Sequence, residues 1–192
     1  MAVLACEERR QTEILRKLRL FASKYTEYTI AVGYFVDALS SVYNSSRMAQ
    51  MAMERGYFEP EAHYLELDQL DHLVQREYID PGIYQVFLRV YQENPWRIRE
   101  WYRAQLQQFA KQKQTMPEGA QIIALTRTFA SQILKDYPES LAAVGESDVE
   151  TYMRQLERTS NIRETEQQFG LLLDGMEHCL EEQNRYSRLV SD

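Results

Sequence analysis

Two short segments of the chain place a carboxylate and an imidazole four residues apart, so that the two side chains would be neighbours on one face of a helix. Asp68 and His72 form the first pair, and Asp174 and His178 form the second. If the two helices faced each other, two carboxylates and two imidazoles could hold a divalent metal ion. The Glu-x-x-His spacing of di-iron bundles is absent, because no acidic residue stands three positions before either histidine. The simpler interpretation places both pairs on solvated helix faces, and we therefore expect no cofactor.

Nucleophilic catalysis has no recognisable signature in the sequence. The two cysteines, Cys6 and Cys179, do not form a CxxC pair. His178 directly precedes Cys179, but consecutive residues on a helix point in different directions. The GxSxG, Walker and GxGxxG motifs are also absent. We therefore name no catalytic residue, and an enzyme is the less favoured interpretation.

Basic and aromatic side chains are concentrated between residues 94 and 113. This segment carries five basic residues against one acidic residue, with four large aromatic side chains among them. Arginine and large aromatic residues are enriched in the hot spots of protein interfaces. The pattern predicts a partner-binding surface formed by Trp96, Arg97, Arg99, Arg103 and Lys113. Alternatively, the other aromatic side chains pack in the core and the arginines coat a solvated wall of the bundle.

Tyrosines are abundant, and several recur at helical spacing. Tyr84, Phe87 and Tyr91 share one helix face, and a second group lies between Tyr25 and Tyr43. Aromatic walls of this kind can line ligand pockets between the helices of a bundle. More often they form an aromatic-rich core with hydroxyl groups at its edge. A small-molecule-sensing bundle with a tyrosine-lined pocket is therefore the second functional hypothesis.

The elements that position these residues are expected to be helices. Four prolines follow residues 59, 80, 94 and 137, where each would occupy the first turn of a helix. The candidate helical segments span residues 7–25, 28–43, 47–55, 60–77, 81–92, 95–113, 120–135, 138–143, 148–158 and 162–188. Residues 28–43 are ambiguous, because their β-branched and aromatic side chains also suit a strand. We favour a helix there because no partner strand is recognisable elsewhere in the sequence.

An apolar stripe marks the last expected helix. Its members recur three and four residues apart, and they are Phe169, Leu172, Leu173, Met176 and Leu180. This spacing suits packing within the bundle or across a dimer.

Length and charge limit the remaining possibilities. A chain of 192 residues suits a single α-helical domain over residues 1–192. We expect this domain to be an all-α bundle of about seven to nine helices. If the chain is subdivided, the boundary would fall at residues 114–119. The net charge of −7 disfavours general nucleic-acid binding, and no apolar run is long enough to span a membrane. Two cysteines without a pairing pattern are typical of a reducing, cytoplasmic environment.

These features favour a non-enzymatic helical interaction or regulatory module that acts through protein–protein contacts. Its partner would be another protein, or a second copy that associates through the C-terminal helix. A metal-dependent helical enzyme is the third hypothesis. The interaction module requires an apolar or aromatic patch exposed on the monomer. The small-molecule-sensing bundle requires a closed pocket lined by tyrosines, and the metal-dependent enzyme requires a metal ion near His72 and His178.

Overall fold

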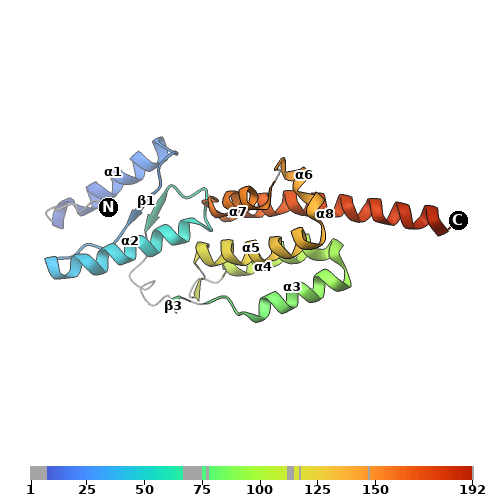
Figure 1. The fold of residues 1–192 in the computed structure, drawn as a ribbon. Helices are drawn as coiled ribbons and strands as arrows, with labels where there is room; N and C mark the ends of the chain where they lie inside the picture. The colour runs from blue at the N-terminus through green and yellow to red at the C-terminus, as the bar shows by residue number, and fades with distance from the viewer. Residues whose placement is uncertain are drawn as a thin grey trace. The chain divides into compact units, whose positions relative to one another are not determined.

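The computed structural model describes residues 8–66, 75–76, 78–111, 115–116, 118–146 and 148–191. Within these ranges the chain forms eight α-helices, and its strands are limited to two pairs of two or three residues each. The predicted all-α class is therefore confirmed. The chain divides into two compact units, Met1–Val74 and Gln75–Asp192 (Figure 1). That boundary lies outside residues 114–119, and the single domain expected from the sequence stays a prediction.

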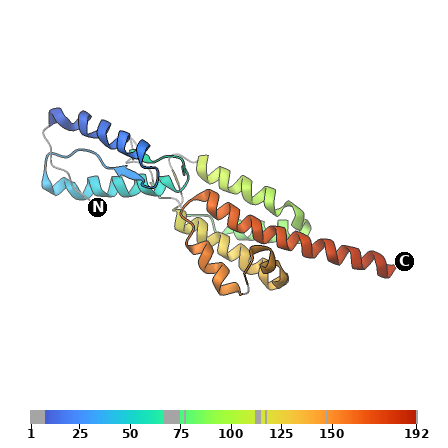
Figure 2. The same ribbon diagram turned by 90° about the horizontal axis from the view of Figure 1, so that it is seen from above.

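The first unit consists of two helices and a strand pair. Its elements are α1 (Gln11–Lys24), β1 (Ile30–Val32), α2 (Val42–Gly56) and β2 (Tyr64–Glu66). β1 and β2 run parallel, with Ile30 opposite Tyr64 and Val32 opposite Glu66. Parallel strands need a crossover connection, and α2 supplies it by packing on both strands. α1 packs on β2, and β1 lies between the two helices (Figures 1 and 2).

The strand pair corrects the sequence prediction for two segments. A helix is wrong for residues 28–43, which contain β1, and for residues 60–77, which contain β2 and β3 (Gln75–Arg76). β1 and β2 form backbone hydrogen bonds with each other, so the partner strand that was not recognisable in the sequence is present. The helix expected at residues 47–55 begins earlier than predicted, because α2 starts at Val42 and includes residues 44–46.

α2 lies unusually close to the chain that follows β1. A Cβ on Gly33 would lie 2.0 Å from the backbone oxygen of Ser45, so only glycine fits there. The hydroxyl of Ser45 also donates a hydrogen bond of 2.6 Å to the backbone oxygen of Tyr34. This contact holds the start of α2 against the end of the strand.

The second unit is a six-helix bundle. Its helices are α3 (Gly82–Glu93), α4 (Ile98–Lys111), α5 (Gly119–Asp136), α6 (Leu141–Val144), α7 (Val149–Glu157) and α8 (Ile162–Ser191). All six lie close to the ranges expected from the sequence. Residues 115–116, within the expected linker, form β4 (Thr115–Met116), which pairs in parallel with β3. α8 is the longest helix and contacts α4, α5, α6 and α7 (Figure 2).

Aromatic side chains form the centre of this second core. Phe87, Phe129 and Phe169 are fully buried, and the ring centroids of Phe87 and Phe129 lie 4.2 Å apart. Tyr102 packs on Phe169 at 4.5 Å, and its hydroxyl lies 2.7 Å from the hydroxyl of buried Thr126. The polar end of Tyr102 is therefore satisfied inside the core, as burial of a hydroxyl requires.

Short polar side chains set the beginnings of the last two helices. The carboxylate of Asp148 accepts a hydrogen bond of 2.8 Å from the backbone N–H of Thr151 at the start of α7. Asp148 is therefore the N-cap residue of α7. At the start of α8, Asn161 accepts from the backbone N–H of Glu164 at 3.0 Å, and Glu164 accepts from that of Ser160 at 2.7 Å. These contacts satisfy N–H groups that the helix itself leaves unpaired.

Two glycines of α8 provide a matched test of its packing. A Cβ on Gly175 would lie 2.4 Å from the backbone oxygen of Ser140, whereas one on Gly170 would meet only the guanidinium end of Arg99, at 3.4 Å. Alanine favours a helix over glycine by about 1 kcal/mol at both positions. We expect Gly175→Ala to lower the free energy of unfolding by about 1–3 kcal/mol, because backbone blocks the new methyl group.

Gly170→Ala should leave the free energy of unfolding unchanged or raise it by up to about 1 kcal/mol, because the Arg99 side chain can move. Chemical denaturation of both variants measures the difference. A Gly175→Ala protein as stable as the Gly170→Ala protein would show that α8 does not pack this closely against residue 140.

Candidate interaction surfaces

The predicted metal ligands are only partly within the described residues. Asp68 and His72 lie outside them. Asp174 accepts a hydrogen bond of 2.5 Å from the guanidinium of Arg99, and His178 is an exposed side chain 3.7 Å from Glu182 on the same helix. Within the described ranges no group of three or more His, Cys, Asp or Glu side chains could hold a metal ion. The expectation that no cofactor binds stays a prediction, because the first pair lies outside the described residues.

The arginines of α4 face acidic side chains of α8. Arg99 donates to Asp174, to Glu177 at 3.3 Å and to the backbone oxygen of Gly170 at 3.3 Å. Arg103 donates to Glu166 at 2.6 Å. Two of the five residues predicted to bind a partner therefore already join two helices of their own unit.

The other members of that predicted surface have different surroundings. Trp96 and Arg97 lie just before α4, in a 3-10 turn, and both are exposed; the exposed fraction of Trp96 is 43%. Lys113 lies outside the described residues. Tyr102 and Phe109 are buried, as the alternative interpretation of this segment requires. Within the described residues, the exposed members of the predicted surface are therefore Trp96 and Arg97, before α4, and Arg103, within it.

Charge reversal tests what the α4–α8 ion pairs contribute. The double change Arg99→Glu and Arg103→Glu would place new carboxylates beside Asp174, Glu177 and Glu166. We expect it to lower the free energy of unfolding by about 1–2 kcal/mol, because favourable pairs become repulsive ones. Arg97→Glu, which changes an exposed neighbour, should shift the melting temperature little. Equal thermal unfolding of the double variant and the wild type would show that the ion pairs add nothing to stability.

The tyrosines of α3 pack against the aromatic core. Tyr84 and Tyr91 stack on Phe87 at centroid distances of 6.1 and 5.7 Å. The hydroxyl of Tyr91 donates to Asp136 at 2.8 Å, which also accepts from Gln132 at 2.9 Å. Burial, and then the bond to Asp136, raise the pKa of Tyr91, so its phenol stays protonated. These rings fill space around Phe87, which suits a packing role; the tyrosine-lined pocket stays untested.

Exposed apolar side chains cluster on α1 and the chain just after it, a surface that the sequence interpretation did not name as a binding site. α1 buries Ala22, while Leu20 and Phe21 are 55% and 45% exposed. The ring of Phe21 lies 4.6 Å from Tyr25 and 6.4 Å from Tyr28, which is 56% exposed. The exposed cations Arg16, Lys17 and Lys24 lie on the same side of the helix as Leu20. We call Arg16, Lys17, Leu20, Phe21, Lys24, Tyr25 and Tyr28 the basic–aromatic face.

A polar network fixes α1 on β2 and so orients this face. Arg19 donates to Glu66 at 2.8 Å, and its guanidinium lies 5.1 Å from the ring centre of Tyr64. The hydroxyl of Tyr64 donates to Glu66 at 3.0 Å. Burial is the first cause that raises the pKa of Tyr64 to about 12, and its bond to Glu66 is the next. Tyr64 therefore remains a neutral donor at neutral pH.

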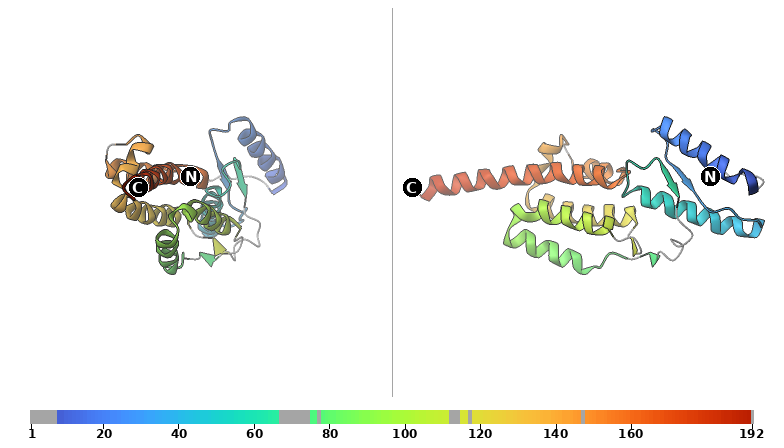
Figure 3. Two further views of the ribbon diagram at one scale, coloured as in Figure 1. Left: turned by 90° about the vertical axis from the view of Figure 1, so that its right-hand side faces the viewer. Right: turned by 180° about the vertical axis from the view of Figure 1, so that it is seen from behind.

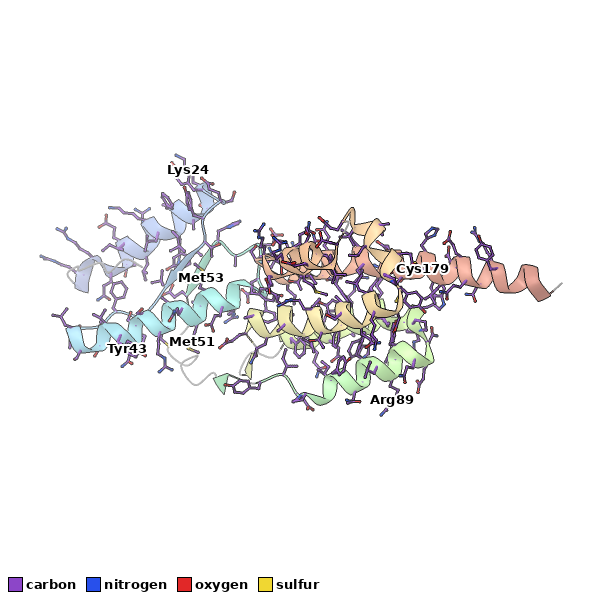
Figure 4. All side chains as sticks on the ribbon, in the orientation of Figure 1. Lys24, Tyr43, Met51, Met53, Arg89 and Cys179 are labelled. Carbon is purple, nitrogen blue, oxygen red and sulfur yellow. The ribbon has the colours of Figure 1, made fainter. Side chains whose placement is uncertain are left out.

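The cations of the basic–aromatic face are not all alike. Lys17 pairs with Glu13 at 2.7 Å, one turn earlier, and lowers the pKa of that carboxyl. The ammonium of Lys24 lies 5.3 Å from the ring centre of Tyr25, a cation–π contact. Figure 4 shows Lys24 at the end of α1, directed away from α2. The face therefore combines accessible positive charge with accessible aromatic surface.

The sequence contained a signal for this face. Phe21 and Tyr25 fit the apolar period of the helix, which favours assigning them to a core. However, the segment from residue 8 to 24 carries six basic side chains and two acidic ones in a chain of net charge −7. A basic helix with more apolar side chains than its packing needs is typical of a binding helix.

Comparison with protein-family models, with curated proteins and with solved structures found no match to this chain. In the part of the chain that the structure describes, no helix combines the length and the apolar character needed to cross a membrane.

Proposed function

We propose that this protein is a non-enzymatic interaction module that binds another protein through the basic–aromatic face of α1. The observation that carries the proposal is the exposed cluster of Leu20, Phe21, Tyr25 and Tyr28. Single exposed apolar side chains are ordinary, but a contiguous cluster ringed by charges is characteristic of interaction sites. Aromatic and basic residues together are also the types enriched at interface hot spots.

The composition of the first unit supports this proposal. Among the described residues of this unit, the buried apolar side chains are Ala22, Met48, Ala52, Tyr57, Phe58 and Leu65. Among these same described residues the exposed large apolar side chains are more numerous, namely Leu20, Phe21, Tyr25, Tyr28, Phe35, Leu39, Tyr43 and Met53. Fully burying one Leu or Phe side chain contributes about 1.5–3 kcal/mol. A partner that covers the face would therefore gain substantial binding energy.

The proposal predicts that apolar contacts on α1 determine partner capture. We expect the triple change Leu20→Ser, Phe21→Ser and Tyr28→Ser to reduce capture of specific partners at least about tenfold. The measurement is quantitative mass spectrometry of proteins retained by the immobilised chain. Because the three side chains are exposed, the melting temperature should change little.

The matched control removes apolar surface elsewhere on the same unit. Leu39→Ser with Tyr43→Ser changes two exposed residues, one just before α2 and one in its first turn, and should leave capture intact. If both variants retain the same proteins in the same amounts as the wild type, the basic–aromatic face is not the binding surface.

A further inference from the structure

α1 packs on the rest of its described unit through one side. Figures 2 and 3 show the strands and α2 on the same side of this helix. Ala22, on the packed side, is 1% exposed, whereas Leu20 is 55% exposed. Because an α-helix turns by about 200° over two residues, these two side chains point in nearly opposite directions. The exposed side of α1 is therefore centred near Leu20.

Two exposed cations lie on this side, one before Leu20 and one after it. Arg16 precedes Leu20 by four residues and Lys24 follows it by four, so the three side chains form one row along the helix. At a rise of about 1.5 Å for each residue, the two cations are about 12 Å apart along the helix axis. Neither forms an ion pair with a carboxylate of the described residues. Their charge is therefore available to a ligand.

Carboxylates bound this row at both ends. Before it, Glu13 is exposed and pairs with Lys17 at 2.7 Å. After it, Glu27 is exposed beyond the end of α1. Arg9 and Arg10 lie about one turn before Glu13, and both already take part in other interactions. Among the described residues of α1, the cations left for a ligand are therefore confined to a stretch of about two to three helical turns.

Apolar surface lies between and beside the two cations. Leu20 stands midway between them, and the next residue, Phe21, is 45% exposed. The ring of Phe21 continues to Tyr25 at 4.6 Å and Tyr28 at 6.4 Å. A ligand that covers this surface needs apolar side chains between its charged ones. An amphipathic helix provides that arrangement, because its residues four apart share one face.

We propose that the basic–aromatic face binds a short acidic amphipathic helix of another protein, with two carboxylates about eight residues apart and an apolar side chain midway between them. In this contact the carboxylates pair with Arg16 and Lys24, and the apolar side chain covers Leu20 and Phe21. Opposite charges on two helices steer their encounter and fix which surfaces meet. The inference rests on the proposed function, because it names the chemistry of the partner at the same face.

Extended anionic partners suit this face less well. An anionic membrane or a nucleic acid presents phosphates over a wide area, so either would also bring negative charge to Glu13 and Glu27. Like charges brought together across a contact cost free energy. A helical ligand places its carboxylates only opposite the two cations. The net charge of −7 further disfavours a nucleic acid.

Selection of peptides on the immobilised full-length chain tests the ligand chemistry without assuming a sequence. The probe is a displayed library of random peptides of about 16 residues, long enough for four helical turns. We expect the enriched peptides to carry Asp or Glu eight residues apart with Leu, Ile, Met or Phe midway. Their affinity, measured by fluorescence anisotropy of the labelled peptides, should fall as salt rises.

Charge reversal then tests the pairing itself. The α1 variant (Arg16→Glu with Lys24→Glu) should bind the enriched peptides at least about tenfold more weakly, with little change in melting temperature. Peptides in which Lys replaces the two acidic residues should prefer this variant to the wild type. The control Arg47→Glu with Arg89→Glu reverses two exposed cations elsewhere and should bind the original peptides like the wild type.

The remaining outcomes separate this inference from the proposed function. A selection that enriches no peptide, or enriches basic or uncharged ones, overturns the acidic ligand, as does equal binding of acidic peptides to the α1 variant. The proposed function still stands if partner capture is lost in the Leu20, Phe21 and Tyr28 variant, and fails if it is not. Cosedimentation of the wild type with phosphatidylserine-containing vesicles, lost in the α1 variant, would overturn the inference and assign the face to a membrane surface.

Discussion

Replacing Phe87 with Ala should lower the free energy of unfolding of the second unit by about 3–5 kcal/mol. Phe87 is fully buried, and its ring lies 4.2 Å from Phe129 and 6.0 Å from Trp101. Removing the ring leaves a cavity among flat side chains that are themselves packed on other rings, so the core cannot close around it. Denaturation by urea, followed by the fluorescence of neighbouring Trp101, measures the loss.

The control for this change is the preceding residue of the same helix. Val86 is exposed, and Val86→Ala should alter the free energy of unfolding by less than about 0.5 kcal/mol. If stability rests on this core, a chelating agent should leave the melting temperature of the wild type unchanged. A Phe87→Ala protein as stable as the Val86→Ala protein, or a melting temperature that falls with chelator and recovers with metal, would contradict the proposed role of the core.

The helices of the second unit were predictable because their signals are local. Amphipathic spacing and short capping side chains lie within a few residues of one another, as at Asn161 and Glu164. The stripe from Phe169 to Met176 was identified from spacing alone, and the structure buries it within the unit. The pattern could not show whether a partner helix came from the same chain.

The strand pair of the first unit depends on contacts that are distant in sequence. Ile30 pairs with Tyr64, and three residues on each side suffice for the ladder. Strands of this length carry too little periodicity to be distinguished from a short helical stripe. The ambiguity at residues 28–43 could be resolved only by knowing that residues 64–66 lie alongside.

The candidate surfaces show the same limit. The basic character of α4 was evident, but the acidic partners of Arg99 and Arg103 lie on α8, more than sixty residues later. On α1, helical spacing groups Phe21 and Tyr25 with Ala22 as apolar positions, but the structure buries Ala22 and leaves Phe21 and Tyr25 exposed. Which side of an amphipathic helix is covered depends on how much neighbouring chain there is to cover it.

Truncating the chain after Ser160 should unfold the second unit. The truncation removes α8 and with it four fully or almost fully buried side chains, Phe169, Leu172, Leu173 and Met176. At about 1.5–3 kcal/mol for each buried side chain, their loss costs about 6–12 kcal/mol. Domains of this size are stable by only about 5–15 kcal/mol, so the remaining helices cannot hold together. Circular dichroism should show a loss of helix well beyond the residues removed.

Truncation after Leu180 is the matched control, because it removes only residues beyond the buried stripe. This chain should keep a cooperative thermal transition close to that of the wild type, since Met176 is the last fully buried side chain of α8 as far as residue 186, where the described side chains end. A folded monomer after truncation at Ser160 would show that the stripe packs across a dimer. A folded dimer would show that α8 is needed neither for the fold nor for association.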